Sequence, residues 1–382
     1  MKSIGIIAEY NPFTNGHLYH LSTVKEKYPE HTIILVMNGN FTQRGIPSII
    51  DKWKRTEIAL QLGIDLVVEL PYPFATQSAD FFAYGAITIL ENLKVEKIIF
   101  GSESDNIDNL ELIAKTQINN DELEKLIKIY SKLGENYPTA LSKAIFDLTN
   151  KKIDTPNDLL GVSYIKTIIK NNYKIKYETI KRENNYHGND LGHNSSASSI
   201  RQALKLHKNV DNYVPKIEIK YLDKLHYLED YFEILKYKII TEKDLSIYQT
   251  VDEGIDKLLK KEITKVNNID DFIKKVKSKR YTHNKITRML NHILCNFTKE
   301  KANNFKEIKY IHILGLNKKG RHYLNLIKKE LTIPLISKIT KNKDDMLEFE
   351  IETTKIYDII KNNNLTKKEF EKIIYLGDEL DD

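Results

Sequence analysis

Two histidines near the amino terminus are the first residues in the chain that could do chemistry. His17 and His20 are three residues apart, so both rings lie on one face of the first turn of a helix. Gly16 lets the backbone approach a ligand, and a helix amino terminus offers free N–H groups to a phosphate chain. Two imidazole donors there could stabilise the charge that develops on an α-phosphate under attack. Alternatively, Thr14 or Asn15 caps the helix and the histidines only pack or face solvent.

A second group of phosphate-binding candidates lies in the stretch SSASSIR at 195–201. Small hydroxyls at a helix start cap the helix and can also donate to phosphate oxygens, which makes Ser196 and Ser198 candidates. Arg201 supplies a planar fork suited to the β- and γ-phosphates. The alternative is a plain serine-rich helix cap.

Basic residues are concentrated in one window of the chain. Residues 274–321 contain fourteen Lys or Arg and two acidic residues, whereas the whole chain of 382 residues has a net charge of only +6. Clustered basic residues are typical of a nucleic-acid-binding face. A solvated, lysine-rich surface is the alternative.

The elements that must position these residues follow from hydrophobic periodicity. Strands are expected at 3–8, 32–37, 65–70, 96–101 and 174–180, with helices at 16–27, 51–62, 78–92 and several between 106 and 172. Apolar strands separated by helices predict a Rossmann-like parallel sheet, with ligands at the carboxyl ends of its strands. Beyond residue 206, helices are expected at 222–240, 254–263, 269–279 and 283–297, with one strand at 310–316.

The sequence therefore predicts an α/β protein with two domains. Residues 1–205 form a nucleotide-binding catalytic domain, and residues 206–382 form a mainly helical, basic domain. The single cysteine, Cys295, excludes an intramolecular disulfide. The apolar run before Glu9 is too short for a signal peptide, and no apolar stretch has the length of a membrane span, so a cytoplasmic location is expected.

The histidine and serine motifs resemble known signatures. TNGH, with His20 one turn later, resembles the T/H-x-G-H signature of the nucleotidyltransferase superfamily. SSASSIR lies in register with that superfamily's I-S-S-T-x-x-R signature, with Ser195 replacing the Ile and Ala197 replacing the second Ser.

The resemblance extends over residues 5 to 321 and is more specific than the superfamily. The chain resembles the bacterial tRNA(Met) cytidine acetate ligase family in the segments GIIAEYNPFTNGHLYHL, MNGNFTQRGIPSIIDKWKRTEIAL, DLVVELP, FGSES, TPNDLLGVSYIK, TIKR, KRYTHNKITRML and ILGLNKKGR. This resemblance implies that acetate and ATP give acetyl-adenylate. The acetyl group then passes to the exocyclic amine of the wobble cytidine of elongator tRNA(Met), forming N(4)-acetylcytidine.

The resemblance also implies which residues bind ATP and which are catalytic. The implied ATP-binding residues are Ile7, Ala8, Glu9, Tyr10, Asn11, Pro12, Phe13, Thr14, Asn15, Gly16, His17, His20, Gly101, Asn157, Arg182, Ser196 and Ser198. The implied catalytic residues are His17, His20 and Arg201. Mg²⁺ is expected only as the usual companion of ATP, held mainly by phosphates and water, and no metal ligands are assigned.

Several of these residues also have simpler interpretations. Gly101 could form a strand-end turn, Asn157 a helix cap, and Arg182 a solvated cation beside Lys181. His187 and His193 lie in a polar loop that could close over ATP, although loop histidines are more often structural or exposed.

The residues expected to bind acetate and tRNA are mostly basic. Arg44 is expected to hold the acetate carboxylate or the acceptor cytidine, with a salt bridge to Asp51 as an equal alternative. Residues suited to grip RNA phosphates or stack on an unpaired base are Lys279, Arg280, Tyr281, Lys285 and Arg288, and a further family segment adds Lys318, Lys319 and Arg321. Acetate and tRNA(Met) are thus the expected partners, and no obligate protein partner is indicated.

Two other functions stay open at this point. A small-molecule adenylyltransferase, of the pantetheine-phosphate or nicotinamide-mononucleotide type, would share both signatures but would end near residue 200. A non-catalytic RNA-binding protein could have kept the fold and lost the chemistry. The basic second half argues against a small-molecule adenylyltransferase, and ATP turnover would exclude a non-catalytic RNA-binding protein.

Overall fold

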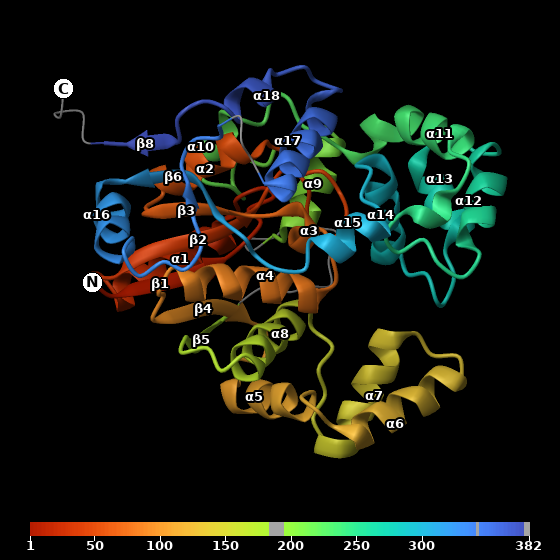
Figure 1. Cartoon of the computed structure of the whole chain (residues 1–382), viewed down its shortest axis with the longest axis horizontal. Coiled ribbons are helices and arrows are strands. Elements are labelled where there is room, and N and C mark those ends of the chain that lie inside the picture. Colours follow the sequence, from red (N-terminus) through yellow and green to blue (C-terminus); the bar gives the residue numbers. More distant parts are fainter. Residues whose placement is uncertain (183–194, 341–343, 378–382) are drawn as a thin grey trace.

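The fold centres on one mixed β-sheet (Figure 1). The structure, a computed structural model, describes residues 1–182, 195–340 and 344–377, so His187 and His193 lie outside the described residues. The strand order is β5-β4-β1-β2-β3-β6-β7, and β8 also pairs with β6. The strands are β1 (Ser3–Ile7), β2 (Thr32–Asn38), β3 (Leu66–Leu70), β4 (Lys97–Ser102), β5 (Lys176–Lys181), β6 (Ile311–Asn317), β7 (Leu335–Ile336) and β8 (Ile374–Leu376).

The first five strands are parallel, as strands that alternate with helices predict. Each begins and ends within two residues of its predicted position. β2 and β3 are buried along their whole length, because helices cover both faces of the sheet (Figure 1). The predicted α/β fold with a mostly parallel sheet is confirmed.

Helices packed around the sheet come from both halves of the chain. They are α1 (Asn15–Lys27), α2 (Lys52–Gln61), α3 (Tyr72–Ala75), α4 (Ala79–Asn92), α8 (Pro156–Lys170), α9 (Ala197–Lys205), α10 (Lys216–Ile219), α15 (Lys299–Asn304), α16 (Lys318–Ile327), α17 (Asp345–Asp358) and α18 (Leu365–Lys368). Among the described residues, no helix combines the length and the apolar character that a membrane span requires.

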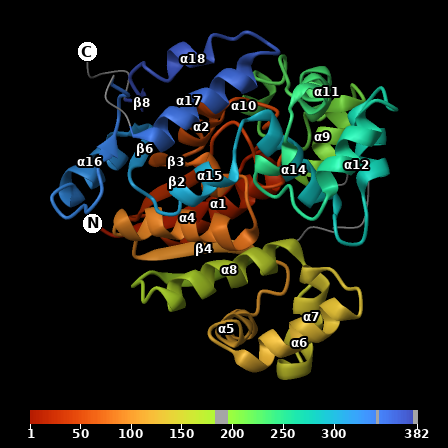
Figure 2. The ribbon, with the colours of Figure 1, turned by 45° about the vertical axis from the view of Figure 1, so that its right-hand side comes forward.

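Two helical lobes project from this central body (Figure 2). The first contains α5 (Ile107–Thr116), α6 (Asp121–Lys132) and α7 (Tyr137–Thr149). The second contains η1 (Leu228–Tyr231), α11 (Phe232–Thr241), η2 (Leu245–Ile247), α12 (Ile255–Ile263), α13 (Ile269–Val276) and α14 (His283–Leu294), and has a hydrophobic core of its own.

The chain returns to the sheet after the second lobe. β6 runs antiparallel to β3, with Glu69 opposite His312, and extends the sheet that the first half began. The main hydrophobic core accordingly contains residues from both sides of residue 206, such as Leu35 and Leu314. The predicted division at residue 206 stays a prediction, and it separates segments that share this core.

One predicted helix is shorter than expected. The α-helical part of the predicted segment 222–240 begins only at Phe232. The backbone N–H of His226 donates instead to the carbonyl of Ile49, 3.0 Å away, and Tyr227 is extended. A backbone group bonded to a distant loop cannot also continue a helical ladder, so the helix starts later.

Candidate active site

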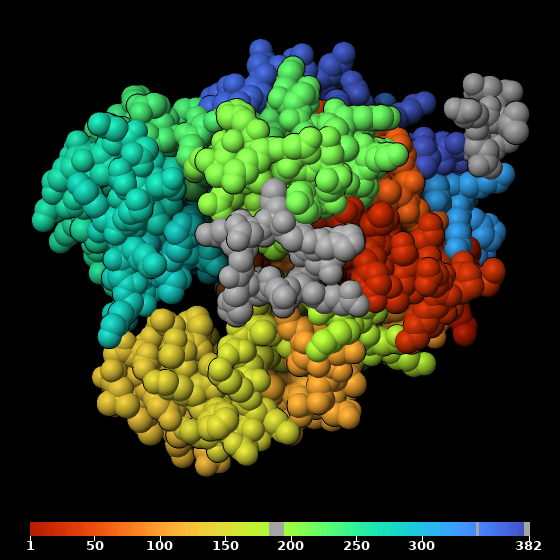
Figure 3. Space-filling view, turned by 180° about the vertical axis from the view of Figure 1, so that it is seen from behind, coloured from red at the N-terminus to blue at the C-terminus, as the bar shows by residue number. Residues whose placement is uncertain are grey.

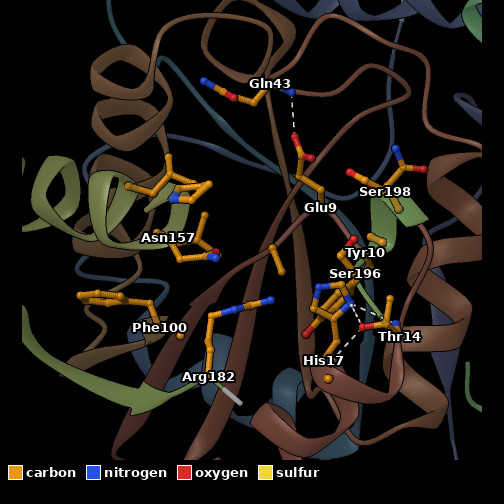
Figure 4. A pocket seen from close by; sticks show the side chains of 18 of the residues that line it. Glu9, Tyr10, Thr14, His17, Gln43, Phe100, Asn157, Arg182, Ser196 and Ser198 are labelled. Atoms are coloured by element: carbon orange, nitrogen blue, oxygen red, sulfur yellow. Dashed lines mark hydrogen bonds between the residues drawn. The ribbon is translucent and has the colours of Figure 1, made fainter. Parts of the chain in front are cut away.

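A cavity of about 940 Å³ opens at the carboxyl ends of β1, β4 and β5, where a parallel sheet is expected to bind its ligand (Figure 4). Its walls come from the loop after β1, the loop after β2 and the amino termini of α1, α4, α8, α9 and α14. The predicted site residues that line it are Ile7, Ala8, Glu9, Tyr10, Asn11, Thr14, Gly16, His17, His20, Arg44, Gly101, Asn157, Arg182, Ser196, Ser198 and Arg201.

Three residues of the predicted ATP set do not line the cavity. Phe13 is buried in the main core. Asn15 is tied to a loop of the second half, because its Nδ2 donates to the carbonyl of Asn212 at 2.9 Å. Pro12 lies between Asn11 and Phe13 in the same turn, so these residues shape the loop and the neighbouring residues face the ligand space.

His17 is fixed by the start of α1. Thr14 is the N-cap: its Oγ1 accepts from the N–H of His17 at 3.3 Å, and its own N–H donates to Nδ1 of His17 at 3.0 Å. Burial, and then the charge of Arg182, lower the pKa of His17 to about 3. The ring is therefore neutral near pH 7, and because Nδ1 accepts, its proton is on Nε2. The Thr14 cap and the position of His17 in the cavity wall are therefore compatible, and a role of His17 toward a ligand stays a prediction.

His20 lies one turn further along the same wall. Burial, and then the charge of Arg182, lower its pKa to about 4, so this ring is also neutral near pH 7. Its buried Nε2 has no hydrogen-bond partner among the described residues. A buried ring nitrogen without a partner is costly unless a ligand or water satisfies it.

Arg182 extends from the end of β5 toward the space between Asn157 and His17 (Figure 4). Gly101 makes room for it: a Cβ added to Gly101 would lie 3.0 Å from Cγ of Arg182. The glycine thus accommodates the arginine side chain, and its predicted contact with adenosine stays a prediction. Arg182 also lies 4.0 Å from the carboxylate of Glu103, so it is not a solvated cation.

Two guanidinium groups meet at one serine. Arg201 donates from Nη2 to Oγ of Ser198 at 3.0 Å and from Nη1 to the carbonyl of Asn11 at 2.7 Å. Arg44 donates to the same Oγ at 3.3 Å. Burial, and then the charge of Arg44, lower the pKa of Arg201 to about 10. Two adjacent positive charges that share only neutral acceptors form a ready site for an anion.

Of the two simpler interpretations considered for these residues, the helix cap at Ser196 is present and the salt bridge of Arg44 is not. Ser196 is indeed the N-cap of α9, since its Oγ accepts from the N–H of Ser199 at 3.1 Å. The alternative salt bridge between Arg44 and Asp51 is wrong. Asp51 caps α2 instead, accepting from the N–H groups of Trp53 at 3.1 Å and Lys54 at 3.0 Å.

At α8, Thr155 is the N-cap, so the alternative in which Asn157 caps this helix is wrong. Asn157 donates from Nδ2 to Oε1 of Glu103 at 2.5 Å, and the other carboxylate oxygen accepts from the N–H of Asp158 at 3.1 Å. This network connects the end of β4 to the start of α8 and holds the cavity wall. Glu103 is not among the predicted site residues, although its position directly after β4 was a signal available in the sequence.

The second helical lobe reaches the cavity through α14. Asn284 lines the cavity, and Oγ1 of Thr287 donates to the carbonyl of Arg44 at 2.5 Å. Gly45 lies close to the backbone of Arg288, since a Cβ added to Gly45 would be 2.3 Å from Cα of Arg288. This contact partly covers Arg288. The loop that carries Arg44 is thereby packed on the basic segment.

The other predicted RNA-binding residues of this segment differ in exposure. Lys279 and Arg280 are exposed, although Arg280 is paired with Glu253 at 2.6 Å. Tyr281 is buried and donates to the carbonyl of Asp252 at 2.7 Å, and Nζ of Lys285 lies 4.2 Å from its ring centre. Tyr281 therefore offers almost no ring face on which a base could stack.

Lys318, Lys319 and Arg321 begin α16 at the opposite edge of the sheet from the cavity. β6 is antiparallel to β3, so its carboxyl end, Leu316, lies beside the amino end of β3, Leu66. Nζ of Lys319 donates to the carbonyl of His31 at 2.8 Å. The structure does not bring these three residues to the site.

In the part of the chain that the structure describes, no group of three or more His, Cys, Asp or Glu side chains is arranged to bind a metal ion.

Comparisons with known proteins agree with this geometry. A family model described as HIGH Nucleotidyl Transferase matches residues 1–372. The tRNA(Met) cytidine acetate ligase of Geobacillus sp. (strain WCH70) is 40% identical over 364 residues, covering 90% of this chain and 91% of that protein. The Bacillus subtilis (strain 168) protein of the same name is 36% identical over 384 residues, covering 94% of this chain and 92% of that protein.

Solved structures are similar over the whole chain. A crystal structure of Thermotoga maritima TmcAL in its apo form has a TM-score of 0.91 and 29% identity, covering 99% of this chain and all of that chain. A second form of the same protein, bound with alpha-thio ATP, has a TM-score of 0.88 and 30% identity over the same share of both chains.

Proposed function

The chain belongs to the HIGH nucleotidyl transferase family and, within it, to the tRNA(Met) cytidine acetate ligases, and from this premise we propose its reaction. The protein is an ATP-dependent ligase that activates acetate as acetyl-adenylate. It then transfers the acetyl group to the wobble cytidine of elongator tRNA(Met), giving N(4)-acetylcytidine. The observation that carries the proposal is one cavity lined by neutral His17 and His20 together with three arginines, Arg44, Arg182 and Arg201.

In the first step, an acetate oxygen attacks the α-phosphorus of ATP, an O–P bond forms and pyrophosphate leaves. His17 donates from Nε2–H to an α-phosphate oxygen, where negative charge increases in the transition state. Arg201 and Ser198 hold the β- and γ-phosphates at the amino terminus of α9. Arg44, beside them and against α14, is suited to the acetate carboxylate or the incoming cytidine.

In the second step, the exocyclic amine of cytidine attacks the acetyl carbonyl carbon, AMP leaves with the electrons of the C–O bond, and the nitrogen releases one proton to water. The acyl phosphate is already activated, so positioning of the base is the main requirement. Mg²⁺ is part of the proposal as the companion of ATP, bound by phosphate oxygens and water.

The experiment that tests this function uses purified protein, ATP, Mg²⁺ and isotopically labelled acetate without acetyl-CoA. It is run with unmodified elongator tRNA(Met), with the same tRNA carrying uridine in place of the wobble cytidine, and without RNA. We expect labelled acetylcytidine only with the first tRNA. Pyrophosphate release with another small acceptor and no labelled RNA would instead assign a small-molecule adenylyltransferase. RNA binding without ATP turnover would assign a non-catalytic RNA-binding protein.

A further inference from the structure

Exposed apolar side chains lead from the mouth of the cavity to the α5–α7 lobe. We call them the apolar rim, and they are Phe81 (50% exposed), Leu133 (73%), Tyr137 (61%) and Leu159 (40%). The inner end of the rim belongs to the cavity wall, because Leu159 lines the cavity and so does Phe82, the next residue after Phe81. Exposed apolar groups that continue a ligand site outward commonly mark where a larger ligand extends.

Four helices carry the rim: Phe81 is on α4, Leu133 at the end of α6, Tyr137 at the start of α7 and Leu159 on α8. Within the lobe, α7 packs on α6 and on α5, and α5 packs on α8; Asp80 lies at the start of α4. Asp80 is itself held to α8, where Nζ of Lys166 is 2.6 Å from its carboxylate. The helices that carry the rim, α4, α6, α7 and α8, thus belong to one packed unit.

A basic segment faces this surface. We call residues 277–285 the basic loop; its exposed cations include Lys279 and Arg280. The pKa of the Glu135 carboxyl, in the turn before α7, is lowered by a hydrogen bond from Lys143 and also by the charge of Lys279. Figure 3 shows α6 and α7, in yellow, opposite the α12–α14 part of the second lobe, in teal.

Charge divides unequally between the two sides. Residues 274–288 contain seven Lys or Arg and no acidic residue, whereas residues 121–149 contain four basic and five acidic residues. An RNA backbone is attracted to the first side only. The second side has little net charge to offer and exposes apolar and aromatic groups, which are the surfaces on which unpaired bases stack.

We infer that the apolar rim is a stacking platform for unpaired bases of the RNA substrate, which lies between the rim and the basic loop. This inference rests on the proposed function and deepens it. It assigns the α5–α7 lobe, from which no RNA-binding residue was predicted, the second wall of the RNA site. The bases next to the target cytidine stack on the rim while the target base enters the cavity.

The test measures binding of an elongator tRNA(Met) transcript by fluorescence anisotropy without ATP. Tyr137→Ala and Phe81→Ala should each weaken the affinity about tenfold, the order expected for one base stacked on an aromatic ring. Tyr137→Phe keeps the ring and should bind like the wild type. Phe146→Ala is the matched control: Phe146 is 48% exposed on the same helix, but nine residues from Tyr137, which places it on the opposite face.

Salt dependence separates stacking from charge. Because no phosphate contact is lost, the slope of log affinity against log salt should stay the same in Tyr137→Ala. Wild-type affinity in both alanine variants, or an equal loss in Phe146→Ala, would overturn the inference while leaving the proposed function intact. A dimer that dissociates in Tyr137→Ala would make the rim an interface between copies and would also overturn it. A wild type that binds no RNA would overturn the proposed function and the inference together.

Discussion

The chemistry of single residues depends on which atom carries a proton. A histidine after a glycine at a helix start has two tautomers, and only one directs a donor at a ligand. The N–H of Thr14 selects that tautomer in His17 by donating to Nδ1. Burial of the ring, and then the charge of Arg182, lower its pKa and keep it neutral. His17 thus supplies a neutral donor that needs no protonation at physiological pH.

We expect His17→Ala to lower the rate of acetate-dependent exchange of pyrophosphate into ATP by about 100-fold or more, because one transition-state donor is lost. The fold should persist, as judged by circular dichroism. His322→Ala, an exposed histidine on α16, is the control and should exchange at the wild-type rate. Near-normal exchange in His17→Ala would rule out its role at the α-phosphate.

Burial of the histidines also predicts how stability changes with pH. His17 and His20 have folded pKa values of about 3 and 4, below the ordinary 6.5. Between pH 6.5 and 4 the unfolded chain therefore binds protons that the folded chain does not. The stability that depends on keeping these two rings neutral is fully present above pH 6.5. It is lost progressively as the pH falls, because protonation then favours the unfolded chain. Urea titrations at several pH values should show this decrease, and His20→Asn should make it shallower. An unchanged pH dependence in His20→Asn would contradict the assignment.

At the scale of elements, a buried ion cluster fastens the end of the chain to the sheet. Nζ of Lys52, at the start of α2, lies 2.8 Å from Glu69 of β3 and 2.8 Å from Glu369, just after α18. His312 of β6 contacts the same Glu69 at 2.6 Å. Attraction in a buried site is strong, but each charge also loses its hydration, so the cluster is stable only when complete.

Lys52→Met should lower the free energy of unfolding by about 3–5 kcal/mol, because it leaves buried carboxylates without their cation. Lys54→Met is the matched control two residues away. Lys54 is partly exposed, and its contacts to Asp51 and Asp223 are 4.0 and 3.9 Å long, so its loss should cost about 1 kcal/mol or less. Urea unfolding of both variants checks this difference, and equal losses would contradict it.

At the scale of the whole molecule, the cavity opens on the side that carries the exposed cations of the basic loop. Helix α16 lies at the far edge of the sheet. Both the basic loop and the basic residues of α16 were predicted from the sequence to bind RNA. Only the first adjoins the atoms that would react, because α14 is packed on the loop that carries Arg44.

We expect Lys279→Gln with Arg280→Gln to weaken tRNA binding and to reduce the slope of log affinity against log salt by about 0.7–0.9 for each charge removed. The comparison is Lys318→Gln with Arg321→Gln, which removes the same charge from the far edge and should bind like the wild type. Anisotropy titrations between low and physiological salt measure both. A larger loss in the α16 pair would move the RNA to the other side of the protein.

The sequence by itself determined the parallel sheet, the side of the sheet on which the cavity opens and the residues at the start of α1 that line it. These features are local: apolar runs specify buried strands, and a Gly-His turn after a strand specifies a phosphate-facing helix start. The same local signals identified Ser196 and Arg201.

Only the tertiary structure decided which distant residues meet. The pairing of Arg44 with Ser198, the filling of the space beside Gly101 by Arg182 and the burial of Tyr281 depend on contacts between segments far apart in the chain. The return of β6 to the sheet and the separation of α16 from the cavity are of the same kind. Hydrophobic periodicity records whether a side chain is buried, but not against which segment, so these relations appear only when the chain is folded.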